Sequence, residues 1–242
     1  MLPCMLIGQS YAGSMGQVDA ASRSGFTPFI GLEGDVTWNN TEAATIFNKA
    51  PSVTYQRWGG RGSLGVTHPF RNNFSLSSEM GWGYYGHTKS TNAGVSPGGI
   101  ASLSVTNNSD IYGFDLLVGA MYNYNQTDLF VKVGAMAENR RFRGDVNSSV
   151  VTSTFSRASS FSVSNTQTNV YPEIKAGGIY NVNENLGLTL AYMHVFGENS
   201  LNSTVHGTYP NTTTTPTTLN SSASIGDPSL NSILFGVVYS FA

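Results

Sequence analysis

Apolar and polar side chains alternate one by one along eight segments of this chain. In the first segment, Ile30, Leu32 and Val36 alternate with Glu33 and Asp35. Because successive side chains of a β-strand point to opposite faces, each segment predicts a strand with one apolar and one polar face. The predicted strands cover residues 28–39, 56–67, 74–86, 111–124, 128–142, 169–181, 185–197 and 231–242. We find no sustained helical periodicity.

The connections between these strands alternate between short and long. Short turns rich in Asn are predicted at 69–73, 125–127 and 183–185. The long, polar connections cover residues 40–55, 87–110, 143–168 and 198–230. Short periplasmic turns and long extracellular loops alternate in this way in outer-membrane barrels. The pattern therefore predicts an all-β fold, an eight-stranded antiparallel transmembrane β-barrel with up-and-down order.

Charged residues provide a test of this interpretation. On the faces assigned to the outside of the barrel we count no Asp, Glu, Lys or Arg in any predicted strand. The inward faces carry Glu33, Asp35, Glu79, Asp115, Asp128, Glu138, Glu173, Arg57, Arg61, Lys132, Arg140 and Lys175. A charged side chain facing lipid costs about 2–4 kcal/mol at the bilayer midplane. A water-soluble barrel would carry its charges outside, so the distribution favours a lipid-facing outer wall.

Aromatic residues gather toward the ends of the predicted strands. They include Trp38, Trp58, Phe74, Trp82, Tyr84, Tyr122, Tyr124 and Phe241. Aromatic rings form girdles at the two membrane–water interfaces of such barrels. Ordinary strand propensity is the alternative explanation for part of this set.

The composition excludes some classes of protein. Of 242 residues, 11% are charged, and the net charge is −2. No cluster of Lys and Arg is present that could neutralise phosphates, so we expect no nucleic-acid partner. No apolar run reaches the roughly 18 residues that a transmembrane helix needs.

The N-terminus predicts processing on export. Residues 1–8 form a short apolar run, and Ser10 to Ala12 resemble a small-residue cleavage site, so residues 1–12 indicate a residual signal peptide. We expect Cys4 to be removed with it, residues 13–25 to form an N-terminal periplasmic segment, and 26–242 to form the barrel.

The last strand resembles the C-terminal strand of outer-membrane proteins. Its alternating residues are Phe235, Val237, Tyr239 and Phe241, and the chain departs from the pattern by ending in Ala242. On this strand the chain resembles small β-barrels of the OmpA-transmembrane and opacity-protein kind. The segment from Ala12 to Gly16 is similar to a group of such proteins in Legionella and Coxiella relatives. The resemblance implies an integral outer-membrane protein whose partners are membrane lipid, lipopolysaccharide and the barrel-assembly machinery.

The inward charges predict a buried network. We expect four acids to pair with four bases, namely Glu33, Glu79, Glu138 and Glu173 with Arg57, Arg61, Arg140 and Lys175. An eight-stranded barrel is just wide enough for side chains to fill it, so we favour a plugged interior. A narrow or gated pore is the alternative.

Other candidate chemistry is sparse. Arg143, Gly144 and Asp145, at the root of a predicted long loop, match an integrin-recognition tripeptide, although Asp145 also suits a turn. His194 lies near the end of a strand without a serine two residues further on, and no acids or histidines recur at metal-ligand spacing. We therefore expect no enzyme, metal or cofactor.

Three functions remain as hypotheses. The first is a structural, surface-exposed protein whose loops contact the environment or a host-cell ligand. The second is a small porin-like channel, and the third is a lipid-modifying outer-membrane enzyme. Fold alone does not decide among them.

Overall fold

The computed structural model describes residues 25–42, 52–95, 101–152, 155–197, 202–209, 217–224 and 229–241. They form ten strands: β1 (Thr27–Glu42), β2 (Ser52–Arg71), β3 (Phe74–Val95), β4 (Ala101–Tyr124), β5 (Thr127–Thr152), β6 (Phe155–Asn181), β7 (Leu186–Val195), β8 (Asn202–Tyr209), β9 (Thr217–Ser224) and β10 (Leu230–Ser240). The predicted signal peptide at 1–12 and nearly all of the predicted segment 13–25 lie outside the described residues. Among the described residues, no helix is long and apolar enough to cross a membrane.

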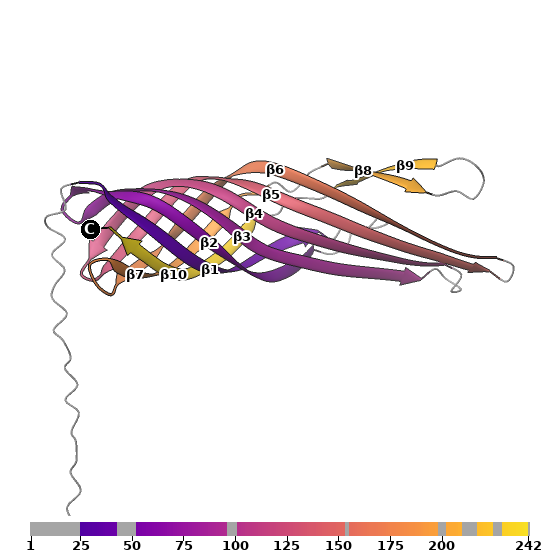
Figure 1. The fold of residues 1–242 in the computed structure, drawn as a ribbon, viewed down its shortest axis with the longest axis horizontal. Coiled ribbons are helices and arrows are strands. Elements are labelled where there is room, and N and C mark those ends of the chain that lie inside the picture. The colour runs from indigo at the N-terminus through magenta and orange to yellow at the C-terminus, as the bar shows by residue number, and fades with distance from the viewer. Residues whose placement is uncertain are drawn as a thin grey trace, which may run out of the picture.

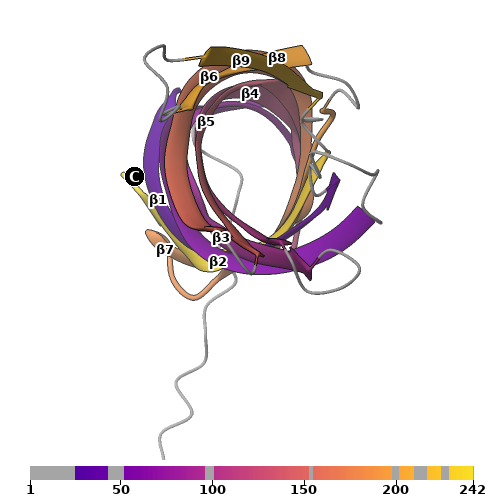
Figure 2. The ribbon, with the colours of Figure 1, turned by 90° about the vertical axis from the view of Figure 1, so that its right-hand side faces the viewer.

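Eight of the strands close into one antiparallel barrel, seen end-on in Figure 2. The order is β1-β10-β7-β6-β5-β4-β3-β2, and β1 closes the cylinder by pairing with both β2 and β10. Closure leaves the barrel without an open strand edge, so all backbone groups in the wall can pair. The predicted fold class is confirmed.

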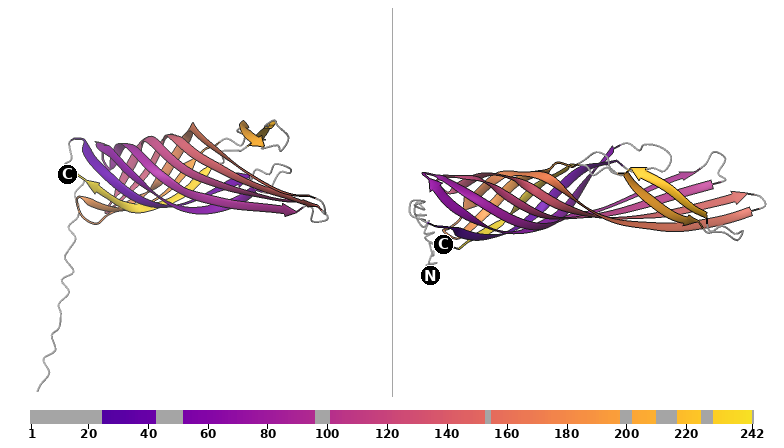
Figure 3. Two further views of the ribbon diagram at one scale, coloured as in Figure 1. Left: turned by 45° about the vertical axis from the view of Figure 1, so that its right-hand side comes forward. Right: turned by 90° about the horizontal axis from the view of Figure 1, so that it is seen from above.

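Four strands continue far beyond the barrel at one end (Figures 1 and 3). β3, β4, β5 and β6 contain 22, 24, 26 and 27 residues. The β5–β6 pairing runs without interruption to Thr152 and Phe155. The prediction of long loops at 87–110 and 143–168 is therefore wrong over most of both ranges. Ser, Thr and Asn dominate these segments, and their few alternating apolar residues, such as Leu103, Val105, Phe161 and Val163, give only a short hydrophobic period.

The predicted loop at 198–230 also contains paired strands. β8 and β9 form a separate two-stranded sheet, and β8 lies beside β6 (Figure 1). The parts of this range at 198–201, 210–216 and 225–228 lie outside the described residues.

Short turns occupy the other end of the barrel, next to the C-terminus (Figure 1). Asn72 and Asn125 adopt left-handed backbone conformations with φ of 52° and 56°, which Asn tolerates better than most residues. In the third turn, the Asn183 side-chain oxygen accepts hydrogen bonds from the backbone N–H groups of Asn185 and Leu186. The prediction of short turns at these three connections is confirmed.

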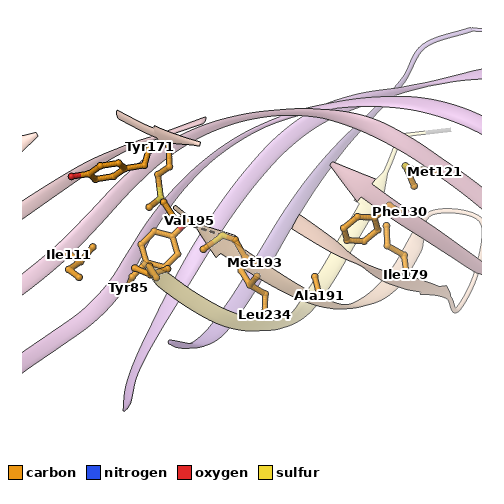
Figure 4. Packing of buried hydrophobic residues seen from close by; sticks show 12 residues of the cluster. Tyr85, Ile111, Met121, Phe130, Tyr171, Ile179, Ala191, Met193, Val195 and Leu234 are labelled. Atoms are coloured by element: carbon orange, nitrogen blue, oxygen red, sulfur yellow. Dashed lines mark hydrogen bonds between the residues drawn. The ribbon is translucent and has the colours of Figure 1, made fainter. Parts of the chain in front are cut away.

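Alternate side chains of each strand in the barrel wall point outward and inward. Along β7, burial alternates at every residue, with Leu188, Leu190 and Tyr192 exposed and Thr189 and Ala191 buried. The buried hydrophobic side chains lie inside the barrel and form one cluster along its axis, with two sets of residues toward its two ends (Figure 4). One contains Met121, Phe130 and Ile179, and the other contains Tyr85, Ile111, Tyr171, Met193, Val195 and Leu234.

Candidate functional site: the outer wall and the charged interior

The outer wall carries a continuous apolar surface. Thirty large hydrophobic side chains of the described residues are exposed, against fourteen hydrophobic residues that are buried. Leu32, Val118 and Leu190, from three strands of the wall, are 68%, 60% and 62% exposed. An exposed surface of this size marks contact with another apolar phase, because soluble monomers rarely expose patches of more than a few hundred Å².

Aromatic rings border this apolar surface at both ends. Near the short turns, the rings of Phe74 and Tyr122 lie 4.9 Å apart between their centroids. Near the extended strands, Tyr112 lies 5.1 Å from Tyr84 and stacks on Trp82 at 6.4 Å. Rings that have one apolar and one wet side suit the boundary between hydrocarbon and water.

One charged residue departs from the predicted clean outer face. Arg141 lies within the predicted strand 128–142, on the same face as Leu129 and Val131, and is exposed. Its guanidinium lies 5.3 Å from the centre of the Tyr112 ring, beyond the apolar surface. The prediction that no charge occupies an outward position is therefore wrong at this residue, because the strand continues past the aromatic border.

Arg61 of β2 is the centre of the charged interior. It is 1% exposed. Its Nη1 donates to Glu33 Oε2 at 2.9 Å and to Glu79 Oε1 at 2.6 Å. Its Nε donates to Asp115 Oδ2 at 2.9 Å, and its Nη2 donates to the other oxygen of the same carboxylate. Arg61 thereby binds three carboxylates from three strands, and charge-assisted contacts of this kind are among the strongest hydrogen bonds in proteins.

Two lysines complete the network. Lys175 Nζ donates to both oxygens of Glu33 at 2.9 Å and to Glu79 at 3.0 Å, and Lys132 donates to Glu79. Each of β1 to β6 thus contributes one charged side chain, giving three acids and three bases. We call this set the central network: Glu33, Arg61, Glu79, Asp115, Lys132 and Lys175. Its charges balance, which avoids the high cost of an unpaired ion held away from water.

An inward glycine of β3 makes room for the central network, a role that the sequence analysis did not assign. The register places Gly81 opposite Asp115, and Gly83 opposite Arg61. A Cβ atom on Gly81 would lie 2.6 Å from Arg61 Nε. The signal that could have identified this role is an inward glycine that lies beside a charged inward residue of the neighbouring strand. Recognising it requires the register between the two strands.

The remaining predicted charges, apart from Asp128, lie nearer the extended end of the interior. Thr37 donates a 2.7 Å hydrogen bond to Asp35, and Arg140 Nη2 lies 3.3 Å from Glu138 Oε1. Within the described part of the chain, Arg57 Nε and Nη1 have no hydrogen-bond partner. The same holds for both carboxylate oxygens of Glu173.

The observed pairs differ in part from those expected. Asp115 and Lys132 join the central network although they were not among the predicted partners. Asp128 lies away from it, near the short turns, where Asn123 and Asn181 donate to its carboxylate at 2.7 and 2.8 Å. The difference arises because strands are staggered along the barrel axis. This stagger determines which inward side chains lie at the same level and can pair.

A small cavity of about 40 Å³ lies between the central network and the short-turn end. Its lining includes Lys132, Lys175 and the rings of Phe29 and Phe130. Lys132 Nζ lies 5.1 and 4.9 Å from the centres of these two rings. A water needs about 10–15 Å³ of such space, so the cavity has room for about three. The central network and the buried hydrophobic groups fill the interior on either side of it.

The predicted adhesion tripeptide lies within a strand. Arg143, Gly144 and Asp145 belong to β5, which pairs on both sides at this height. Gly144 is buried, and Arg143 Nε lies 3.5 Å from Asp145 Oδ1. The expected position at the root of a loop is therefore wrong, since β5 continues to Thr152.

The three histidines whose side chains the structure describes have ordinary partners. His194 Nδ1 is 2.8 Å from Asn231 Oδ1, and its ring packs edge-on against Phe196 at 4.4 Å. His68 packs on Phe26 at 4.8 Å, and His87 Nδ1 contacts Asp110 at 2.9 Å. In the part of the chain that is described, no group of three or more His, Cys, Asp or Glu could hold a metal ion.

The last strand closes the barrel. In β10, Phe235, Val237 and Tyr239 are exposed on the outer wall, and Phe241 follows the strand. The Phe241 N–H donates to Pro28 O at 2.9 Å, across the seam with β1. The residues that carry the resemblance to C-terminal barrel strands thus occupy the seam at which this cylinder closes.

Several solved structures have a similar fold. Ail of Yersinia pestis, solved with the heparin analogue sucrose octasulfate, is 12% identical with a TM-score of 0.37, covering 89% of this chain and 97% of Ail. OprG of Pseudomonas aeruginosa is 12% identical with a TM-score of 0.46, covering 89% and 96%. The outer membrane protease OmpT of Escherichia coli is 10% identical with a TM-score of 0.44, covering 89% and 96%.

No protein-family model matches the chain, and no characterised protein matches it in sequence. At the identities and scores above, the likeness adds no argument about activity or partners. The predicted resemblance to small outer-membrane barrels is confirmed in fold, whereas the OmpA or opacity subtype stays a prediction.

Proposed function

We propose that this chain is an integral protein of the bacterial outer membrane. The barrel anchors it, and the extended ends of β3 to β6 form a surface outside the cell. The observation that carries the proposal is the segregation of side chains in the wall: hydrophobic groups face outward between two aromatic borders, while the central network is buried inside. In water this arrangement would expose thirty large hydrophobic side chains of the described residues.

The filled interior favours an anchor and surface protein over a channel. Arg61, Glu79 and Lys175 are each at most 5% exposed and bind one another across the lumen. An ion crossing the barrel would have to break several charge-assisted bonds. Steady large conductance in planar bilayers would contradict this part of the proposal and favour the porin-like alternative.

The surface role rests on the extended strands. Beyond the aromatic border, β4, β5 and β6 pair for more than ten residues, up to Ala101, Thr152 and Phe155. This paired structure would hold polar side chains well clear of the lipid, where an environmental or host-cell ligand could contact them. Adhesion through Arg143 to Asp145 stays a hypothesis.

Labelling of intact cells tests location and orientation together. In a Cys4→Ser background, which removes the one native cysteine, a membrane-impermeant maleimide is applied to cells carrying Ser162→Cys or Gln126→Cys. Ser162 is exposed on the extended part of β6, and Gln126 lies in a short turn. We expect labelling at position 162 in intact cells and at position 126 only after lysis. The reverse result, or recovery of the protein outside the outer-membrane fraction, would overturn the proposal.

A further inference from the structure

Just beyond the aromatic border, cationic side chains gather on the outward faces of β3 and β5, on either side of β4. The register places Arg141 opposite Asp110, which in turn lies opposite His87. One step further out along each strand, Arg143 and Lys89 both lie opposite Asn108. We call Lys89, Arg141 and Arg143 the cationic strip.

The residues of the strip are accessible. Lys89 and Arg141 are exposed, and 66% of the Arg143 side chain is exposed. Of the two nearby carboxylates, Asp110 accepts a hydrogen bond from Tyr84 Oη at 3.1 Å and contacts His87. Among the described residues, Asp145 makes a long 3.5 Å contact with Arg143 Nε.

The height of the strip decides what it faces. Arg141 lies over the ring of Tyr112, the last aromatic residue of the apolar surface on β4. Successive outward positions on a strand are about 7 Å apart, so Lys89 and Arg143 lie within one further step. If the aromatic border marks the edge of the hydrocarbon, as the proposed function requires, the strip lies at the level of lipid headgroups.

We propose that the cationic strip binds the phosphate groups of a phosphorylated lipid in the outer leaflet. Guanidinium and ammonium groups are the usual protein partners of phosphate. The acyl chains of the same lipid would lie along the apolar wall below, beside Trp82 and Phe114, which are exposed there. This continuity of charge with an apolar surface favours a membrane lipid over a soluble anion.

Native mass spectrometry of the full chain tests the proposal. The protein is reconstituted in phosphatidylcholine nanodiscs containing lipid A or its dephosphorylated form, and bound lipid is counted. We expect phosphorylated lipid A to be retained in preference to the dephosphorylated form. Replacing the three cations by glutamine should weaken retention by about fivefold for each cation removed. Arg141→Lys keeps the positive charge, so it should retain most of the lipid A that Arg141→Gln loses.

Arg71→Gln is the matched control, because Arg71 is an exposed arginine at the short-turn end of β2. We expect it to leave retention unchanged. Equal retention of the two lipids would overturn the proposal, and so would a loss of retention in Arg71→Gln equal to that in the strip variants. A preference of the strip for a soluble polyanion over lipid A, measured in detergent, would overturn it as well. Failure of the wild-type chain to insert into nanodiscs would contradict the proposed function as well, whereas insertion without phosphate preference contradicts only this inference.

Discussion

Arg61 and Asp115 form a bidentate salt bridge that spans an intervening strand. Arg61 belongs to β2 and Asp115 to β4, and β3 lies between them in the barrel wall. Nε donates to Oδ2 at 2.9 Å, and Nη2 donates to Oδ1. The pair can form because β3 presents Gly81 to the interior opposite Asp115, where a side chain would collide with the Arg61 guanidinium.

The first prediction concerns this glycine gap. We expect Gly81→Ala to lower the free energy of unfolding by about 1–3 kcal/mol, the usual range for overpacking. The new methyl group would meet the Arg61 guanidinium, which three carboxylates hold in place. Gly62→Ala is the control, since a Cβ at that outward position meets nothing within 4 Å. Urea unfolding in lipid vesicles measures both, and equal stabilities would refute the packing argument.

The second prediction concerns charge balance in the interior. Arg61→Met leaves three carboxylates facing two lysines, and breaking a buried ion pair in this way destabilises by about 3–5 kcal/mol. Adding Asp115→Asn restores equal numbers of acids and bases, with Glu33 and Glu79 facing Lys132 and Lys175. We therefore expect the double variant to unfold at a higher urea concentration than Arg61→Met alone. A double variant no more stable than the single one would show that charge balance is not what the network supplies.

The third prediction concerns the outer wall. Val118 lies midway between the two aromatic borders of β4 and is 60% exposed. We expect Val118→Arg to lower stability in vesicles by about 2–4 kcal/mol, because the charge would face hydrocarbon. Thr106→Arg lies on the same face of β4, beyond Tyr112, and should change stability by no more than about 0.5 kcal/mol. Similar losses of stability for the two variants would contradict the prediction, because both positions would then face the same medium.

The barrel itself could be predicted from the sequence because alternation is a local property. In a segment such as 128–142, the two-residue period assigns Val131 and Lys132 to opposite faces without any knowledge of neighbouring strands. The same parity identified all six residues of the central network as inward. Because lipid lies outside the barrel and charges lie inside, each strand segment that crosses the membrane has a strong two-residue hydrophobic period.

The extended strands and the pairing of charges could not be predicted in the same way. Beyond Tyr112, both faces of β4 are free of hydrocarbon, so Asn108 and Thr106 carry no hydrophobic period although their backbone is paired. The contact of Arg61 with Asp115 depends on the stagger of β2 relative to β4, which no local pattern encodes. The prediction of a charge-free outer face fails at Arg141 because the sequence does not mark where the membrane ends.

Accessibility of spin labels tests the central claim, the lipid-facing outer wall, most directly. Single cysteines at Leu116, Val118 and Ala120, all exposed positions of β4, are labelled in the Cys4→Ser chain and reconstituted in vesicles. Collisions with oxygen, which concentrates in hydrocarbon, are compared with collisions with a water-soluble nickel chelate. We predict that oxygen dominates at these three positions and the chelate dominates at Thr106→Cys. Free access of the chelate to position 118 would contradict the account.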